Sequence, residues 1–243
     1  MLEVKNLSHA PRGSVAIQNF DLTLEDGEKL AIIGLHNSGK SMLLQILAGY
    51  IIPHEGSIKI GQSDLRYNAQ EARRYFGYVP SHPTLNGEWK VEETFRMFAT
   101  MRGMPFPTNT AEDLAEKWLL KKELSHCIHE LHYGQKMRVL MALATLHDPD
   151  LIFLDDPFQG LDPKELHSTI DILGRKFSKS SMILATNTVE CLPGWIDRIL
   201  VLDSGSTVID QKFLGIAPLM QTLAELWKEP RGNDKESLDT LSP

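Results

Sequence analysis

The stretch GLHNSGKS, residues 34–41, decides how the rest of the chain is interpreted. It directly follows the apolar run EKLAIIG (28–34), which is typical of a buried strand, and it opens the helix-like run KSMLLQILAG (40–49), which Gly49 closes. A strand, a loop of the form G-x-x-x-x-G-K-S/T and a helix together present backbone amides and a helix N-terminus to phosphate oxygens. The sequence therefore predicts a phosphate-binding loop.

The residues of this loop have different expected roles. Gly34 and Gly39 let the backbone curl, Lys40 places a positive charge beside the β- and γ-phosphates, and Ser41 can ligate Mg²⁺. An ordinary glycine-containing turn is the alternative, but it does not explain the strand and the helix on either side. We expect the whole loop to contact ATP, through Gly34, Leu35, His36, Asn37, Ser38, Gly39, Lys40 and Ser41.

Two carboxylates end a second apolar run, DLIFLDD (150–156). Asp155 lies where the predicted strand ends, so we expect it to hold Mg²⁺ beside the nucleotide, directly or through a water molecule. The alternative is an aspartate that only caps the following turn. With the loop accepted, the sequence predicts Asp155 and Ser41 as metal ligands.

Apolar runs bounded by turn residues predict the centre of the fold. They indicate strands buried on both faces of a parallel sheet, and helix-like stretches lie between them, such as 163–177, with Asp162 and Pro163 as cap and first-turn residues. This alternation predicts an α/β fold. The runs are at 28–34, 150–156, 181–187 and 198–204.

Two further regions have different patterns. Apolar and polar residues alternate near the N-terminus, which predicts an antiparallel sheet beside the parallel one. From about residue 89 to 146 the pattern is helical, which predicts an insertion of helices. The alternating segments are 2–9, 14–28 and 55–65, and the helical stretches are 91–103 and 111–124, separated by the breaker PFPTN (105–109).

Composition restricts the class of protein. A chain of 243 residues with 42% hydrophobic content can bury a substantial core, while a net charge of −7 argues against binding nucleic acid or an anionic membrane surface. Cys127 and Cys191 have no CxxC spacing and suit a reducing cytosol. No apolar run approaches the ~18 residues of a membrane span, and the polar residues 228–243 are expected to form a tail outside the core.

The order of the motifs points to a family. GLHNSGKS (34–41) is followed by ELHYGQKMRVLMALATLHDPDLIFLDDP (130–157) and GLDP (160–163). In this order and spacing the chain resembles the nucleotide-binding subunits of ABC transporters, with a Walker A loop, a signature segment joined to Walker B, and a D-loop, up to about Gln211. The resemblance implies a P-loop NTPase fold of ABC type, with a mixed central sheet flanked by helices, an antiparallel β subdomain and an inserted helical subdomain at about 82–146 within a domain of residues 1–227.

The resemblance also implies partners. In that family two subunits face head to tail and hold two ATP molecules between the Walker A loop of one and the signature of the other. This chain's signature therefore predicts contacts with a partner's ATP through Leu131, His132, Tyr133, Gly134 and Gln135. His132 and Tyr133 replace a serine and a glycine of the usual L-S-G-G-Q, and Tyr133 adds bulk where the backbone approaches phosphate closely.

Three further positions depart from the family's pattern. Asp156 stands where a glutamate usually polarises the attacking water, Asn187 stands at the switch histidine, and Ser81 in FGYVPSHP stands at the glutamine that reaches toward Mg²⁺ and water. A carboxylate that is one methylene shorter leaves the water out of reach by about an ångström, which can cost ~10²-fold in rate. We expect Asp156 and Asn187 to carry the remaining hydrolysis and Ser81 to lie near the metal.

Two side questions remain open in the sequence. No aromatic residue lies between Leu7 and Asn19, where the family often stacks a tyrosine on adenine, so His9 or Arg12 is the candidate substitute. His126, Cys127, His129 and His132 lie close together in sequence, which suggests either a metal site or, as we favour, solvated or capping histidines at a helix start.

These observations predict an ATP-binding, ATP-hydrolysing subunit of a membrane transporter, paired with transmembrane permease subunits and lying on the inner face of the cell membrane. Residues 85–105 resemble the helical region of exporter-type subunits, so we expect an exporter, and Met97, Met101 and Met104 suit packing or docking to the membrane partner. Because these departures affect both sites of a homodimer, we favour a heterodimer with a better-equipped sister subunit over a homodimer that hydrolyses slowly. The alternative is a pseudo-ATPase that binds ATP and regulates its partner; a soluble protein acting on DNA or ribosomes lacks support.

Overall fold

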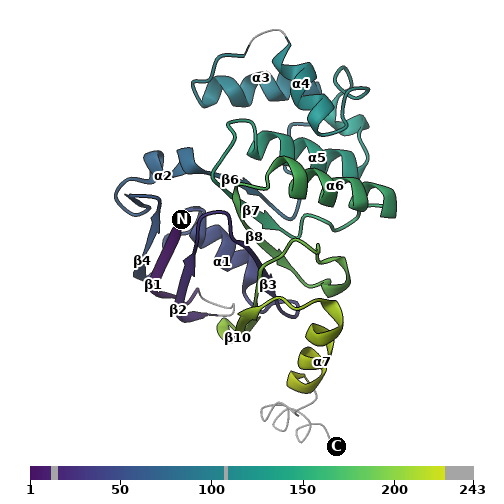
Figure 1. Cartoon of the computed structure of the whole chain (residues 1–243). Coiled ribbons are helices and arrows are strands. Elements are labelled where there is room, and N and C mark those ends of the chain that lie inside the picture. The colour runs from purple at the N-terminus through teal and green to yellow at the C-terminus, as the bar shows by residue number, and fades with distance from the viewer. Residues whose placement is uncertain (12–15, 107–108, 228–243) are drawn as a thin grey trace, which may run out of the picture.

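Two β-sheets with one helix between them form the centre of the molecule in the computed structural model, which describes residues 1–11, 16–106 and 109–227 (Figure 1). Helix α1 (Lys40–Leu47) buries Leu43, Leu44, Ile46 and Leu47 in the core between the sheets. The helix that follows the predicted loop is therefore buried rather than on the surface, because both sheets pack against it.

The larger sheet has the order β10-β9-β3-β8-β7-β6. All its neighbouring strands are parallel except β10, which runs antiparallel to β9. The four predicted parallel strands are confirmed, and β6 and β10 join the sheet at its two edges. The strands are β3 (Lys29–Ile33), β6 (Phe76–Val79), β7 (Leu151–Asp155), β8 (Ser181–Thr186), β9 (Arg198–Asp203) and β10 (Ser206–Lys212).

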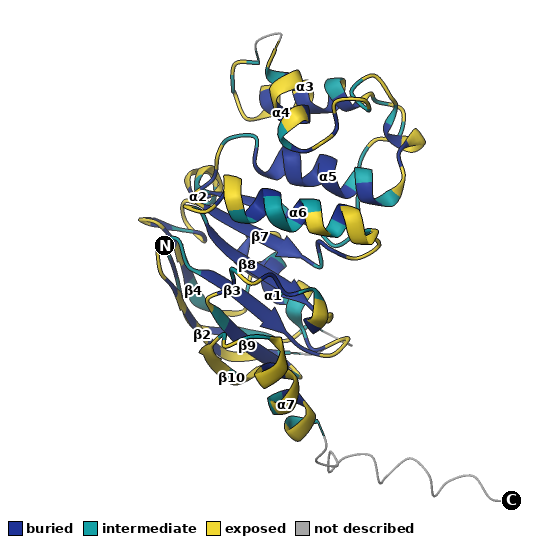
Figure 2. Ribbon diagram, turned by 45° about the vertical axis from the view of Figure 1, so that its right-hand side comes forward, coloured by how far each residue is buried: buried dark blue, intermediate teal, exposed yellow. Residues whose placement is uncertain are grey.

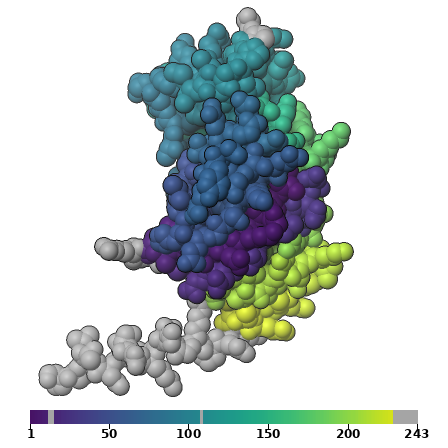
Figure 3. Space-filling model, turned by 90° about the vertical axis from the view of Figure 1, so that its left-hand side faces the viewer, coloured from purple at the N-terminus to yellow at the C-terminus, as the bar shows by residue number. Residues whose placement is uncertain are grey.

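The smaller sheet confirms the predicted antiparallel subdomain. Its order is β2-β1-β4-β5, with antiparallel pairing throughout. Figure 3 views the molecule from the side on which this sheet, in purple and blue, covers the α/β core. The strands are β1 (Leu2–His9), β2 (Ile17–Leu24), β4 (Glu55–Ile60) and β5 (Ser63–Asp64).

Helices α3, α4, α5 and α6 lie one above another on one side of the sheets. In Figures 1 and 2, α3 and α4 lie farthest from the sheets, and the largely buried α5 lies between them and α6. No helix within the described residues is long and apolar enough to cross a bilayer. The remaining helices are α2 (Ala69–Tyr75), α3 (Val91–Met101), α4 (Thr110–Lys117), α5 (Tyr133–Ala144), α6 (Pro163–Lys176) and α7 (Ile216–Leu226), with short 3₁₀ turns η1 (Ile128–Glu130) and η2 (Val189–Cys191).

One helix begins where the sequence predicts it, and another ends earlier than predicted. Helix α6 begins as predicted, because the Asp162 side chain accepts a hydrogen bond from Glu165 N at 2.8 Å. Helix α4 was predicted to reach residue 124 but ends at Lys117, since Leu119 adopts a left-handed φ of 57°. Residues 107–108 of the predicted breaker and the predicted tail, 228–243, lie outside the described residues.

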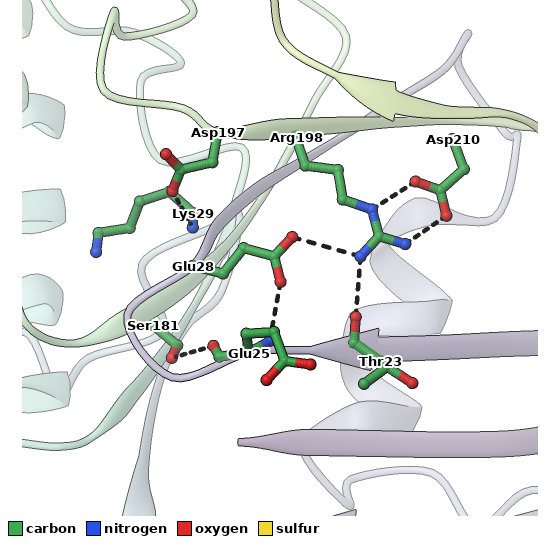
Figure 4. A network of polar contacts seen from close by, with 8 residues as sticks. All are labelled: Thr23, Glu25, Glu28, Lys29, Ser181, Asp197, Arg198 and Asp210. Atoms are coloured by element: carbon green, nitrogen blue, oxygen red, sulfur yellow. Dashed lines mark hydrogen bonds and ion pairs between the residues drawn. The ribbon is translucent and has the colours of Figure 1, made fainter.

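One polar network ties the two sheets together (Figure 4). Arg198 on β9 donates from Nε and Nη2 to both carboxylate oxygens of Asp210 on β10, and from Nη1 to the carbonyl oxygen of Thr23 on β2 at 2.9 Å. Nη1 also lies 3.4 Å from Glu28 Oε1. Because the hydrogen bonds with Asp210 and Glu28 favour the charged form, they raise the pKa of Arg198.

Candidate nucleotide-binding site

The loop at residues 34–41 connects the carboxyl end of β3 to α1 and requires both of its glycines. A Cβ on Gly34 would stand 2.3 Å from the carbonyl oxygen of Leu202 and 2.5 Å from Ser38 Oγ, and Gly39 has a φ of 100°. Both positions are therefore closed to ordinary side chains, at the first for lack of space and at the second by backbone conformation. The loop curls directly over the end of the central sheet.

Lys40 shows how the loop would hold an anion. Its Nζ donates to the carbonyl oxygens of Gly34 at 2.9 Å and Leu35 at 2.8 Å, and to Ser38 Oγ at 3.2 Å. Burial lowers the pKa of Lys40, while the nearby carboxylates of Asp156 and Asp155 raise it. A phosphate group fits this environment, because it would supply the negative charge that neutral carbonyl oxygens only approximate.

Ser41 and Asp155 form the pair expected of a metal site. Ser41 Oγ donates to Asp155 Oδ1 at 2.9 Å, and Asp155 is only 2% exposed. Its other oxygen, Oδ2, is buried and has no hydrogen-bond partner within the part of the chain that the structure describes. Mg²⁺ prefers hard oxygen ligands, so a hydroxyl beside a buried, half-unpaired carboxylate fits this ion.

The ionisation of Asp155 reflects the same environment. Burial raises the pKa of this carboxyl, and the nearby hydroxyl groups of Ser41 and Ser81 lower it. Ser81 thus lies beside Asp155, where sequence reasoning placed it, and its hydroxyl is also 3.1 Å from His82 Nδ1. Ser41, Ser81 and Asp155 converge although they lie on three separate segments.

Asp156, the expected hydrolytic carboxylate, is held in an unusual conformation. It has a left-handed φ of 47°, its backbone N–H donates to the carbonyl oxygen of Ala185 at 2.9 Å, and its Oδ1 accepts from Thr186 Oγ1 at 3.0 Å. Thr186 was not among the expected residues. One oxygen of an already short side chain is therefore engaged by the chain itself.

Asn187, at the switch position, contacts the phosphate loop. Its Nδ2 lies 2.9 Å from His36 Nε2, so the amide donates to an imidazole nitrogen that carries no proton. Its Oδ1 accepts from Thr188 Oγ1 at 3.2 Å. The structure thus brings the switch segment and the loop together through one contact between side chains.

The signature segment begins α5. Leu131 is buried, and His132 caps the helix, with Nδ1 accepting from Gln135 N at 3.4 Å and Gln135 Oε1 accepting from His132 N at 3.1 Å. His132 therefore caps the helix in place of the serine of the usual L-S-G-G-Q signature. Gly134 is buried, and a Cβ there would stand 2.4 Å from Glu165 Oε2.

Glu165, on α6, is a second residue that sequence reasoning missed. It accepts from Asp162 N at 3.3 Å, and its Oε1 lies 3.3 Å from Arg138 Nη2 and 3.5 Å from His132 Nε2. The signal that could have identified it is its place three residues after the cap Asp162. It joins the signature helix to the D-loop.

Tyr133 turns into its own chain. Its hydroxyl donates to the carbonyl oxygen of Ser81 at 2.8 Å, and its ring packs against Gly160, where a Cβ would stand 2.8 Å from Tyr133 Cδ1. Burial, followed by the charge of Asp156, raises the pKa of Tyr133. The sequence suggested added bulk facing a partner's phosphate; the structure instead gives the phenol an acceptor within its own chain.

The remaining candidates make no hydrogen bond to the loop among the described residues, although His9 pairs with Ile17, whose side chain lies beside Gly39. His9 stacks on His54 with ring centroids 4.4 Å apart, and Arg12 lies outside the described residues. His129 Nδ1 lies 2.9 Å from the carbonyl oxygen of Gly87, while burial raises the pKa of Cys191. Of the histidines at 126–132, His129 contacts a turn and His132 caps α5, and no cluster of possible metal ligands occurs among the described residues.

Comparison with known proteins identifies the family. A family model described as ABC transporter matches residues 17–159, from β2 to the residue before the D-loop. This chain belongs to the ABC transporter family. The matched region contains the Walker A loop, the signature and Walker B.

Individual ABC proteins resemble it along most of its length. The ABC-type transporter ATP-binding protein EcsA of Bacillus subtilis is 26% identical over 96% of this chain and 99% of EcsA. Nod factor export ATP-binding protein I of Cupriavidus metallidurans is 26% identical over 87% of this chain and 71% of that protein. ABC transporter G family member 4 of Arabidopsis thaliana is 31% identical over 82% of this chain, which spans only 35% of that longer protein.

The fold is also that of a solved ABC protein. A structure described as the ATP binding subunit of an ABC transporter superposes with a TM-score of 0.80 at 27% identity, and covers 93% of this chain and 98% of that one. The predicted ABC-type fold is therefore confirmed.

Proposed function

We propose that this chain is the ATP-binding subunit of an exporter and that it binds ATP-Mg at the interface of a heterodimer. The observation that carries the proposal is the Ser41–Asp155 pair beside the curled loop, because it offers a metal an unpaired, buried carboxylate oxygen next to a phosphate cradle. The export direction is supported by the name of one relative, a Nod factor export protein, and by residues 85–105.

The proposed residue roles follow the geometry. The loop residues 34–41 hold the phosphates, and Ser41, Asp155 and Ser81 hold Mg²⁺, directly or through water. The Mg²⁺ held by these residues would neutralise part of the phosphate charge. Asp156 orients the attacking water and Asn187 donates to the γ-phosphate. The signature segment 131–135 faces the ATP of the partner subunit with its backbone and His132, while the Tyr133 side chain stays within its own chain.

We also propose the domain division on which these roles rest. Residues 1–227 form one ABC domain, and residues 82–146 form a helical subdomain inserted between β6 and β7. A groove of about 620 Å³ at the base of this subdomain is lined by residues such as Tyr50, Phe98, Met101 and Arg102. Met101 is 74% exposed there, and we propose that the groove receives a segment of the transmembrane partner.

Slow hydrolysis is the expected consequence of the site. Asp156 is one methylene shorter than glutamate, and its Oδ1 is already bonded to Thr186. Asn187 cannot carry the positive charge of a histidine. A homodimer would have these defects in both sites, which supports a sister subunit with a better-equipped site.

A pseudo-ATPase is the second candidate. It is favoured by the Thr186–Asp156 bond and by the contact of Asn187 with His36. In both cases a side chain expected to act in hydrolysis is bonded to another side chain of the same subunit. In that function the chain binds ATP and completes its partner's site while hardly turning over.

The experiment that tests the proposal is steady-state ATP hydrolysis and ATP binding by the chain alone and co-expressed with candidate sister and membrane subunits. Lys40→Ala should abolish tight ATP binding, and Lys59→Ala, which removes an exposed lysine on β4, should not. Activity that appears only in the assembly and falls with Lys40→Ala supports a hydrolysing subunit. If the wild-type chain binds ATP tightly but Lys40→Ala leaves the hydrolysis rate of the assembly unchanged, the chain is the pseudo-ATPase. If the wild-type chain does not bind ATP, both candidate functions are refuted.

Asp156→Glu separates the causes of slow turnover. The added methylene extends the carboxylate toward the water, so the rate should rise about 10-fold or more if reach is limiting. An unchanged rate with intact ATP binding would assign the defect to Ser81 and Asn187 instead.

A further inference from the structure

Tyr133 lies where three segments of the chain meet. Ser81, whose carbonyl oxygen accepts its hydroxyl at 2.8 Å, is on the segment by which the chain leaves β6 for the helical insertion. Helix α5, which Tyr133 begins, is the helix by which the chain returns, and Gly160 follows Asp156 in the turn after β7. One side chain therefore contacts the segment that enters the insertion, the helix that leaves it and the turn that carries the hydrolytic carboxylate.

The fit between Tyr133 and these segments is close. Gly160 has a φ of 71° and no room for a Cβ beside the phenol ring, so ring and turn pack directly on each other. A glycine at position 133, as in the usual signature, would supply neither the ring nor the hydroxyl. The contact is a property of this chain's departure from that signature.

A second connection runs parallel to the first. Glu165 accepts from Asp162 N and lies within ion-pair distance of Arg138 on α5. The start of α5 is thus tied to the D-loop at Gly160 through Tyr133 and near Asp162 through Glu165. Movement of α5 relative to the central sheet must either carry residues 156–162 with it or break these contacts.

We propose that Tyr133 is a positioning residue for ATP hydrolysis, which ties the first turn of α5 to the turn that carries Asp156. This inference rests on the proposed function. In the proposed dimer, α5 faces the partner's nucleotide while Asp156 serves the chain's own, so Tyr133 links the two sites through one subunit. Asp156 takes its working position when the signature helix of the same chain takes its own.

Tyr133→Phe tests the link, because it keeps the ring but removes the hydrogen bond to Ser81 that holds the ring in place against Gly160. In the assembled complex, kcat should fall about 2- to 10-fold, as for loss of one neutral hydrogen bond, while KM for ATP stays within about twofold. Tyr67→Phe, which alters a 77% exposed phenol, is the matched control. A kcat for Tyr133→Phe equal to that of the control would overturn the proposal.

A second readout does not depend on turnover. With 3-fluorotyrosine at position 133, the ¹⁹F signal should shift when ATP-Mg is added, and should not shift in a chain that also carries Lys40→Ala. An unmoved signal despite measured ATP binding overturns the proposal while leaving the proposed function intact. Absence of ATP binding by the wild-type chain instead refutes the proposed function itself.

Discussion

Replacement of Asp155 by asparagine should stabilise the free protein and remove its response to ATP-Mg. Asp155 is buried, its Oδ2 has no hydrogen-bond partner among the residues described, and burial raises its pKa above the usual value. These observations describe a negative charge that the free protein compensates only in part. Removal of this charge should raise the free energy of unfolding and weaken the binding of ATP-Mg.

The expected gain follows from the unpaired oxygen. A buried polar group without a partner costs about 1–3 kcal/mol, and more when it is charged. The amide keeps an acceptor for Ser41 Oγ, still leaves one polar atom unpaired, and gives up the attraction to Lys40. We therefore expect a net gain of about 1 kcal/mol in the free energy of unfolding, or about 2–4 °C in Tm for a chain of this size.

The gain should depend on pH. A carboxyl whose pKa is higher in the folded than in the unfolded state destabilises the fold only when it is ionised, so the penalty is absent below the unfolded-state pKa and complete above the folded-state pKa. The difference in Tm between Asp155→Asn and wild type should be largest at neutral pH. It should shrink as the pH falls toward about 4, the usual pKa of an aspartate.

Thermal unfolding with and without ATP-Mg measures both effects. At ~100 times Kd the ligand should stabilise the wild type by ~2.7 kcal/mol and the variant far less, so that the order of the two Tm values reverses. Asp150→Asn, which changes an exposed carboxylate just before β7, is the control and should do neither. A variant less stable than wild type at neutral pH, or one that responds equally to ATP-Mg, would refute the reasoning.

Two further substitutions test the loop and the link between the sheets. Gly34→Ala should weaken ATP binding about 10-fold or more, because its Cβ would collide with the carbonyl oxygen of Leu202, whereas Gly194→Ala, with open space around it, should bind normally; equal affinities would contradict the packing argument. Arg198→Met should lower the free energy of unfolding by about 2 kcal/mol, between the values for buried and exposed ion pairs. Arg175→Met, on a 79% exposed side chain, should change it by less than about 0.5 kcal/mol, and chemical denaturation that finds the two equal would show that the network adds no stability.

Elements with a strong local signal could be predicted from the sequence. Strand β3, the loop and α1 follow from one short motif, and β7 and β8 are continuous apolar runs. Strand β10 could not be predicted because its residues are mostly exposed, and it forms by pairing with β9. The early end of α4 at Lys117 depends on the backbone conformation of Leu119, which no periodicity reveals.

The site divides in the same way. Residues fixed by a motif, such as Lys40, Ser41 and Asp155, were placed correctly beside one another. Contacts between distant segments were not foreseen, because no local pattern encodes them: the hydroxyl of Tyr133 reaches a carbonyl 52 residues away, and Thr186 bonds to a carboxylate 30 residues away. Which group a polar side chain bonds to depends on the fold of the whole chain. At this site, the bond from Thr186 determines that one oxygen of Asp156 is already occupied.

The position of β3 also has a consequence for synthesis of the protein. Both strands that flank it, β8 and β9, come from the last third of the chain, and the loop at Gly34 packs against Leu202. During synthesis, the complete GLHNSGKS motif therefore leaves the ribosome long before strands β8 and β9, which pack beside it, have been made. Chains that stop before residue 181 carry the motif but neither of the strands that flank β3, so we expect interrupted synthesis to yield products that bind ATP less tightly than the finished subunit.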